Sequence, residues 1–229
     1  MRLQAVHSVL LNNNINRAEL WRRRELLHSL ALWAVWRPAF SDMSNNKNTS
    51  TRYTGTAKAL HWILALALIG IFAFGLYMTS LPFSPARLKY FNWHKWAGMT
   101  ILILSALRII WRITHRPPAL PEAVTRAMPA WQHIAHHGVH HLMYVLFFAI
   151  PLVGWAYSSA AGFPIVLFGV LPLPNLVGKS PELAEALKPW HGYLAYALAA
   201  LVVLHIAAVV KHQLIDRDGL LARMLPGKA

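Results

Sequence analysis

Residues 190–212 read WHGYLAYALAALVVLHIAAVVKH and decide the fold. The run contains no acidic residue, and it is long enough to cross a bilayer, which takes about 20 residues as a helix. His191 and His205 are 14 residues apart. At about 100° per residue they face nearly the same direction, and the rise between them is about 21 Å. The stretch therefore predicts a transmembrane helix with two imidazoles on one face, one near each side of the membrane.

Three more runs of this kind precede it in the chain. They cover about residues 59–81, 93–113 and 137–160, and none contains an acidic residue. Hydrophobic residues make up 56% of the 229 residues and charged residues 13%, a composition too apolar for an ordinary soluble domain. The connections contain the prolines at which we expect helices to stop and start: Pro85, Pro117, Pro118, Pro121, Pro181 and Pro189. The sequence predicts an all-α integral membrane protein, a bundle of four transmembrane helices.

Two segments lie outside the four spans. Residues 162–178 are apolar but interrupted by prolines; we interpret them as a loop at the membrane surface, with a re-entrant segment as the alternative. Residues 1–50 form a basic N-terminal extension ahead of a membrane domain over residues 51–229. Three interpretations of the extension stay open: a targeting segment, an amphipathic surface helix, or a start-site artefact with translation beginning at Met43.

The basic residues indicate how the chain is oriented in the membrane, and they do not indicate a surface that binds nucleic acid. The formal net charge is +14, but no nucleic-acid-binding motif accompanies it, so we expect no nucleic-acid partner. Positive residues lie beside the apolar runs, with an excess before the first span, between the second and third, and after the fourth. Because cytoplasmic loops carry such an excess, both termini are predicted to be cytoplasmic.

Four histidines within the spans can be paired by depth. His61 lies in the first turn of the first span, on the cytoplasmic side, and His94 begins the second span on the opposite side. The fourth span runs inward, so His191 lies at its outer end and His205 deep toward the cytoplasm. This pairs His61 with His205 and His94 with His191. For any one histidine alone, a hydrogen bond to a neighbouring helix is the alternative.

Paired imidazoles at two depths indicate two b-type haems enclosed by the bundle. The chain has no cysteine, which excludes covalent c-type haem and iron–sulfur clusters. The iron of the cytoplasmic-side haem would be held by His61 and His205, and that of the outer haem by His94 and His191. Two histidines on one iron close both axial positions, which suits electron transfer rather than oxygen binding.

Five more histidines gather at the cytoplasmic mouth of the third span: His133, His136, His137, His140 and His141. They are interpreted as an interfacial polar cap, or as hydrogen-bond partners of a haem propionate or a quinone. A metal site is the other alternative, but no acidic residue or cysteine lies nearby to complete its ligand set. A further alternative is that His137 or His140 replaces one of the four ligands named above.

His212 lies seven residues after His205, on nearly the same face and about 10 Å nearer the cytoplasm. An imidazole takes up and releases protons near neutral pH, so His212 is a candidate catalytic residue that delivers protons to a quinone. An ordinary interfacial histidine is the equal alternative. Basic side chains that could neutralise haem propionates at this end are Arg52, Lys58, Arg108, Arg112 and Lys211.

These residues together resemble the bacterial cytochrome b561 family. The resemblance covers about residue 52 to the C-terminus and rests on LHW at 60–62, WHK at 93–95, WH at 190–191 with His205, and the tail at 220–226. It implies four transmembrane helices in the bacterial inner membrane, two b haems and electron exchange with membrane quinone. It also implies the same four histidine ligands that depth selects.

Within this family, the sequence is similar to members that pass electrons from superoxide to ubiquinone, and His212 matches a histidine at their quinone site. A basic outer mouth would attract the superoxide anion; its candidates are Arg87, Lys89, Lys95 and Lys179. The proline-rich 161–188 loop with two glutamates, and the N-terminal extension, depart from the pattern. We expect a superoxide:quinone oxidoreductase. The alternatives are a subunit that relays electrons between quinone and a partner dehydrogenase or hydrogenase, and a carrier of haem or metal ions.

Overall fold

The computed structural model describes residues 52–225, so the predicted N-terminal extension lies outside the described residues. The elements in chain order are α2 (Gly55–Ser80), α3 (Pro85–Thr114), α4 (Glu122–Ala127), α5 (Ala130–Ala160), β1 (Val166–Leu167), β2 (Leu171–Pro172) and α6 (Pro181–Lys211). A π-helical turn, His212–Asp216, and a 3₁₀ turn, Leu221–Arg223, follow α6. In this described part, four helices are long and apolar enough to cross a membrane. The predicted four-helix membrane fold is confirmed.

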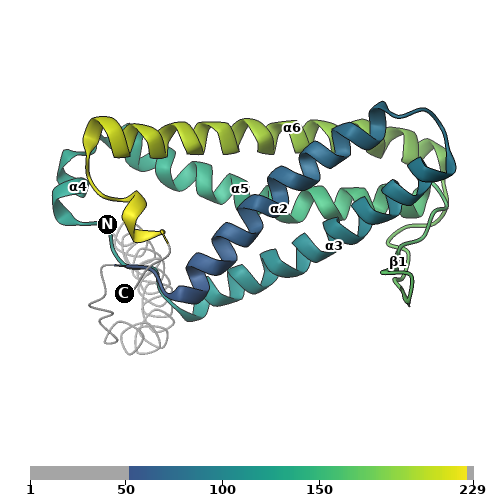
Figure 1. Cartoon of the computed structure of the whole chain (residues 1–229), viewed down its shortest axis with the longest axis horizontal. Helices are drawn as coiled ribbons and strands as arrows, with labels where there is room; N and C mark the ends of the chain where they lie inside the picture. The colour runs from purple at the N-terminus through teal and green to yellow at the C-terminus, as the bar shows by residue number, and fades with distance from the viewer. Residues whose placement is uncertain (1–51, 226–229) are drawn as a thin grey trace, which may run out of the picture. The chain divides into compact units, whose positions relative to one another are not determined.

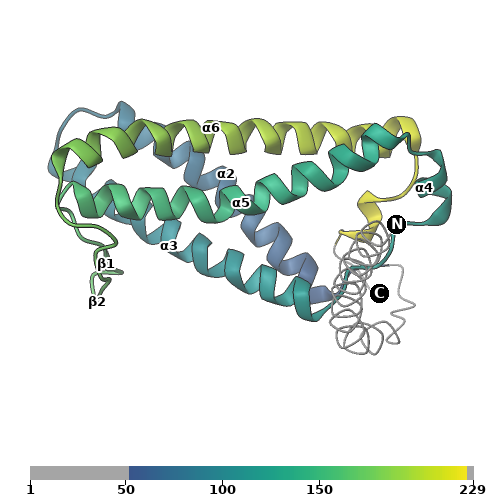
Figure 2. The same cartoon turned by 180° about the vertical axis from the view of Figure 1, so that it is seen from behind.

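The helices pack in neighbouring pairs. α5 runs along α6, α2 packs on α3, and α3 also contacts α5, while α2 crosses obliquely to reach α6 (Figure 1). Leu146, Phe147 and Leu198 are buried where α5 meets α6. Large apolar side chains such as Leu66 and Val203 are about two-thirds exposed. Such an exterior suits lipid, which replaces water as the solvent of a membrane helix. Both views place α4 and the C-terminal turns at one end of these helices and β1 at the other (Figure 2).

Three of the four long helices have a hydroxyl side chain as their N-cap. The hydroxyls of Thr54, Ser84 and Ser180 accept hydrogen bonds from backbone N–H groups in the first turns of α2, α3 and α6. Pro85 and Pro181 follow the last two caps, where a missing N–H costs nothing because the helix does not use it. These caps lie several residues before the predicted starts of the spans, because the helices continue beyond the apolar runs.

Two predictions about the fourth span and its neighbours were wrong. α6 begins at Pro181 rather than near residue 190, and Pro189, interpreted as a helix boundary, lies inside it. The Ser180 cap fixes the start, and the helix continues past Pro189 with one backbone donor fewer. The short helix α4 between the second and third spans was not predicted.

The segment between α5 and α6 is a loop, as predicted, and contains a small antiparallel hairpin. Val166 pairs with Pro172, and Leu167 with Leu171. At its tip Gly169 has a φ of +76°, in the left-handed region that glycine adopts without strain. The indole of Trp96 on α3 donates to the Val166 carbonyl at 2.7 Å. This bond ties the hairpin to the helix that carries His94.

Candidate functional site

The structure brings together the two pairs of histidines that depth predicts. The ring centroids of His61 on α2 and His205 on α6 are 6.4 Å apart. Those of His94 on α3 and His191 on α6 are 6.1 Å apart. Since α6 is continuous between its two histidines, the pairs are separated by about 21 Å along it. One helix thus contributes a histidine to a cluster near each end of the bundle.

These separations fit one iron between each pair. Two imidazoles on opposite sides of a metal ion place their ring centres about 6 Å apart, because each metal–nitrogen bond is about 2 Å and the nitrogen is about 1 Å from its ring centre. Imidazole is a suitable ligand for iron, and each pair consists of two imidazoles alone. The donor set therefore suits a haem with two histidine ligands at either end.

The pair predicted to be the outer one, His94 and His191 (the outer pair below), has one ring held by backbone and one buried nitrogen without a partner in the part of the chain that the structure describes. His191 Nδ1 lies 3.1 Å from the carbonyl oxygen of Ile150 on α5. A carbonyl only accepts, so the proton of His191 is on Nδ1 and the lone pair of Nε2 is free. Holding the second nitrogen in this way fixes the ring of a metal ligand. His94 Nδ1 is buried without a hydrogen-bond partner among residues 52–225, and buried polar atoms of this kind mark places where a further group is expected.

Two glycines lie against the rings of the outer pair. A Cβ atom on Gly154 would lie 2.9 Å from Cε1 of His191, and one on Gly75 would lie 3.3 Å from Cε1 of His94. Gly154 is one helical turn after Ile150, so carbonyl and glycine border the same ring. Any larger residue at these positions would move the imidazoles.

The pair predicted to be the inner one, His61 and His205 (the inner pair below), differs because His61 contacts an arginine. The Arg108 guanidinium lies 3.1 Å from His61 Nδ1, and its Nε donates to the Tyr144 hydroxyl at 3.2 Å. Arginine only donates, so His61 Nδ1 accepts and the proton of His61 lies on Nε2. To hold a metal through Nε2, His61 would have to carry this proton on Nδ1 instead, and Arg108 would give up the contact. Arg108 is then available to an anionic group, as the sequence predicts for propionates.

His140 on α5 is the nearest further histidine to the inner pair. Its ring centroid lies 5.3 Å from that of His205, and its Nδ1 donates to the His136 carbonyl at 2.6 Å. The separation is shorter than the spacing across one iron. His140 is thus placed for contact with His205, and the alternative that it replaces a ligand stays open.

Two other histidines of the cluster bond to backbone carbonyls. His133 Nε2 contacts the Thr125 carbonyl at 3.2 Å, and His141 Nδ1 contacts the His137 carbonyl at 2.7 Å. In the described part of the chain, one group of three or more potential metal ligands has its ligand atoms within 4.8 Å of one another: His212, Asp216 and Asp218. The five histidines at the mouth of α5 do not form such a group.

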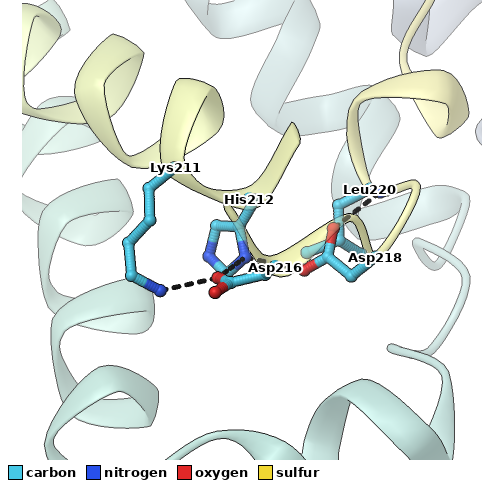
Figure 3. A network of polar contacts seen from close by, with 5 residues as sticks. All are labelled: Lys211, His212, Asp216, Asp218 and Leu220. Carbon is cyan, nitrogen blue, oxygen red and sulfur yellow. Dashed lines mark hydrogen bonds and ion pairs between the residues drawn. The ribbon is translucent and has the colours of Figure 1, made fainter. Parts of the chain in front are cut away.

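His212 lies in the π-helical turn within a small polar network (Figure 3). Its Nδ1 is 2.6 Å from Asp218 Oδ2 and 3.0 Å from Asp216 Oδ2. Lys211, predicted to neutralise a propionate, instead contacts Asp216 at 2.6 Å. The sequence reasoning missed both aspartates. A signal was present in the His-x₃-Asp-x-Asp spacing directly after the last span.

The tail that follows closes the same end of the bundle. Arg223 is 8% exposed and donates to the carbonyls of Pro118 and Ala119, at 3.2 and 2.7 Å. The indole of Trp62, next to His61, donates to the Met224 carbonyl at 2.9 Å. These bonds tie Arg223 and Met224 of the tail motif to the end of the bundle that carries His61.

The basic side chains of the opposite end lie against aromatic rings and the loop. Lys95 donates to the Phe163 carbonyl at 3.1 Å, and the Lys89 ammonium is 5.1 Å from the ring centre of Trp93. The Lys179 stem passes beside Gly162. Of the basic residues predicted for an outer mouth, Lys95 and Lys179 therefore lie against the loop, while Arg87 and Lys89 lie against aromatic rings of α3.

Comparison with known proteins agrees with this architecture. The prokaryotic cytochrome b561 family matches residues 52–227. Cytochrome b561 homolog 2 of Escherichia coli K12 is 32% identical over 188 residues, covering 78% of this chain and 93% of the relative. The probable superoxide oxidase CybB of Yersinia pestis is 28% identical over 184 residues (77% and 97%), and cytochrome b561 homolog 1 of E. coli K12 is 30% identical over 189 residues (76% and 97%). The chain belongs to the prokaryotic cytochrome b561 family, whose members bind b-type haem and transfer electrons in bacterial membranes.

Proposed function

We propose that the chain oxidises superoxide at the His94 end of the bundle and reduces ubiquinone at the His61 end, through two b-type haems. The observation that carries this proposal is the presence of two imidazole pairs, 6.1 and 6.4 Å between ring centres, near opposite ends of the membrane helices. When bound, the haems supply one-electron redox chemistry across the membrane.

The chain's own residues hold and orient the group at each end. His94 with His191, and His61 with His205, would each hold one haem iron, and a haem held by two histidines suits electron transfer rather than oxygen binding. The Ile150 carbonyl fixes the His191 ring. At the inner end, Arg108 and Arg112 both lie 5.8 Å from the Tyr144 ring centre, and their charges suit carboxylates of a propionate-bearing group.

The proposed reaction balances with two superoxide anions for each quinone. Each superoxide loses one electron and becomes dioxygen, and one ubiquinone gains two electrons and two protons and becomes ubiquinol. The protons enter at the inner end, where His212 is the candidate donor. Positive side chains beside His94 would steer the superoxide anion. The similarity to a relative named as a probable superoxide oxidase supports this choice of donor.

Stopped-flow mixing of purified protein with superoxide and ubiquinone-1 tests the proposal. We expect haem reduction faster than spontaneous dismutation, and one ubiquinol for two superoxide anions, with a rate that falls as salt screens the attraction. Haem that exchanges electrons with quinol but not with superoxide would contradict the proposal. Co-purification with a periplasmic redox subunit would then favour the relay function.

A further inference from the structure

The polar network behind the inner histidine pair gives His212 two carboxylate neighbours for one N–H. Asp218 is the closer, with Oδ2 at 2.6 Å from Nδ1 against 3.0 Å for Asp216. Its side chain is also the more buried of the two, with 11% exposed against 30% for Asp216. A short contact in a place with little water is the stronger one, because solvent competes less for the carboxylate.

Lys211 neutralises Asp216, which weakens the attraction of this second carboxylate for the N–H of His212. Its ammonium lies 2.6 Å from Asp216 Oδ2, the same oxygen that faces His212. Asp218 instead uses its second oxygen, Oδ1, to accept from the Leu220 N–H at 3.1 Å (Figure 3). That bond fixes the carboxylate, since the N–H belongs to the turn around Gly219, whose φ is +72°.

We propose that Asp218 is a positioning residue that holds the proton of His212 on Nδ1, so that Nε2 is free to exchange protons with a bound quinone. A carboxylate on one imidazole nitrogen fixes the tautomer and stabilises the imidazolium that forms when the other nitrogen takes up a proton. The inference rests on the proposed function, in which quinone is reduced at this end.

The surroundings of His212 favour a proton relay over a metal site. His212, Asp216 and Asp218 are close enough to share a cation. The Lys211 ammonium, however, already forms an ion pair with Asp216 and balances its negative charge. His212 directly follows α6, seven residues and about 10 Å along the helix axis after His205. Its imidazole is thus at the same end of the bundle as the inner pair, where a substrate at that pair needs a proton donor.

An asparagine at position 218 separates this role from a structural one. Asp218→Asn retains an oxygen that accepts from the Leu220 N–H, so the turn is kept. Its amide group offers a donor to His212 in place of the carboxylate, which favours the proton on Nε2. Asp216→Asn is the matched control, because it removes a neighbouring carboxylate that Lys211 already neutralises.

The first test follows oxidation of chemically reduced haem by ubiquinone-1 in full-length protein in nanodiscs, and so needs no superoxide. We expect His212→Gln and Asp218→Asn to lower the maximal rate at least ~10-fold, with KM for quinone and the haem spectrum nearly unchanged. Asp216→Asn should stay within about threefold, since it leaves the general-acid path intact. The second test is ¹⁵N NMR of histidine-labelled protein, in which the His212 signal is assigned by its loss in His212→Gln. The proton should be on Nδ1 in the native chain and on Nε2 in Asp218→Asn.

The outcomes separate the two proposals. One outcome is that His212→Gln oxidises its haem slowly while Asp218→Asn keeps the native rate and the native His212 tautomer. This would overturn the role of Asp218 but leave the quinone site at His212 standing. Full activity of His212→Gln would overturn the roles of both His212 and Asp218 while leaving quinone reduction itself intact. Failure of ubiquinone-1 to oxidise the haem of the wild-type chain would overturn the proposed function as well. Stoichiometric zinc retained by the purified chain and lost in Asp218→Asn would show a metal site in place of the relay.

Discussion

At the residue scale, the two histidine pairs differ in whether a ring already has the tautomer that leaves Nε2 free to bind iron. His191 already has its proton on Nδ1, held by the Ile150 carbonyl. His61 instead accepts from Arg108, so its proton must move before Nε2 is free. Both pairs have the spacing that one iron requires, but only the outer one has a ligand held in the bonding tautomer by backbone.

Gly154→Ala tests the close packing of the outer pair. The added Cβ would lie 2.9 Å from the His191 ring, which Ile150 prevents from moving freely. Overpacking of this kind costs about 1–3 kcal/mol, so we expect lower haem retention and an altered EPR signal from the outer haem. Both are read on purified protein.

Gly138→Ala is the control on the same helix, because nothing lies within 4 Å of the position of its Cβ. It should keep the native haem content and spectrum. An unchanged EPR signal in Gly154→Ala would show that the His191 ring does not lie against α5 in the loaded protein.

The histidine pairing was predictable from the sequence, whereas the glycine contacts were not. Depth follows from position in an apolar run, and the face from 3.6 residues per turn, so His205 and His61 could be matched without coordinates. That Gly154 touches His191, or that Asp218 reaches His212, depends on how helices and turns meet. No period in the sequence encodes these contacts.

At the element scale, the C-terminal tail closes the inner end through Arg223. Its guanidinium donates to two loop carbonyls. Hydrogen bonds that involve a charged group contribute about 1.5–3 kcal/mol, so we expect Arg223→Ala to lower the free energy of unfolding by roughly that amount. Thermal loss of the haem absorbance measures the effect.

Arg126→Ala provides the comparison. Arg126 pairs with Glu122 on α4, where both side chains are more than 80% exposed, and such surface pairs add little to stability. Equal melting of the two variants would contradict a structural role for the tail.

The helices themselves were predictable, and their ends were not. Hydropathy locates the part of a helix that lies in lipid, which is why four spans could be found. Hydropathy does not detect the polar first turns of α3 and α6, because the starts of these helices depend on the caps Ser84 and Ser180. The π-helical turn around His212 has no sequence signature of its own.

At the scale of the whole molecule, the two ends of the bundle should face opposite compartments. The native chain has no cysteine, so single cysteines report sidedness without background. Val170 at the hairpin is 83% exposed, and the Glu122 side chain on α4 is 86% exposed. We expect a membrane-impermeant maleimide to label Val170→Cys in intact cells, and Glu122→Cys only after the inner membrane is opened. The reverse pattern would place the termini in the periplasm.

The central claim is that four histidines hold two haems, one at each end of the bundle. The most direct measurement is the number of b haems per chain, by pyridine haemochrome, in the wild type, His205→Ala and the control His141→Ala, whose ring contacts its own helix. The account predicts two haems in the wild type and the control, and one in His205→Ala. A single haem in the wild type, or two retained in His205→Ala, would contradict it.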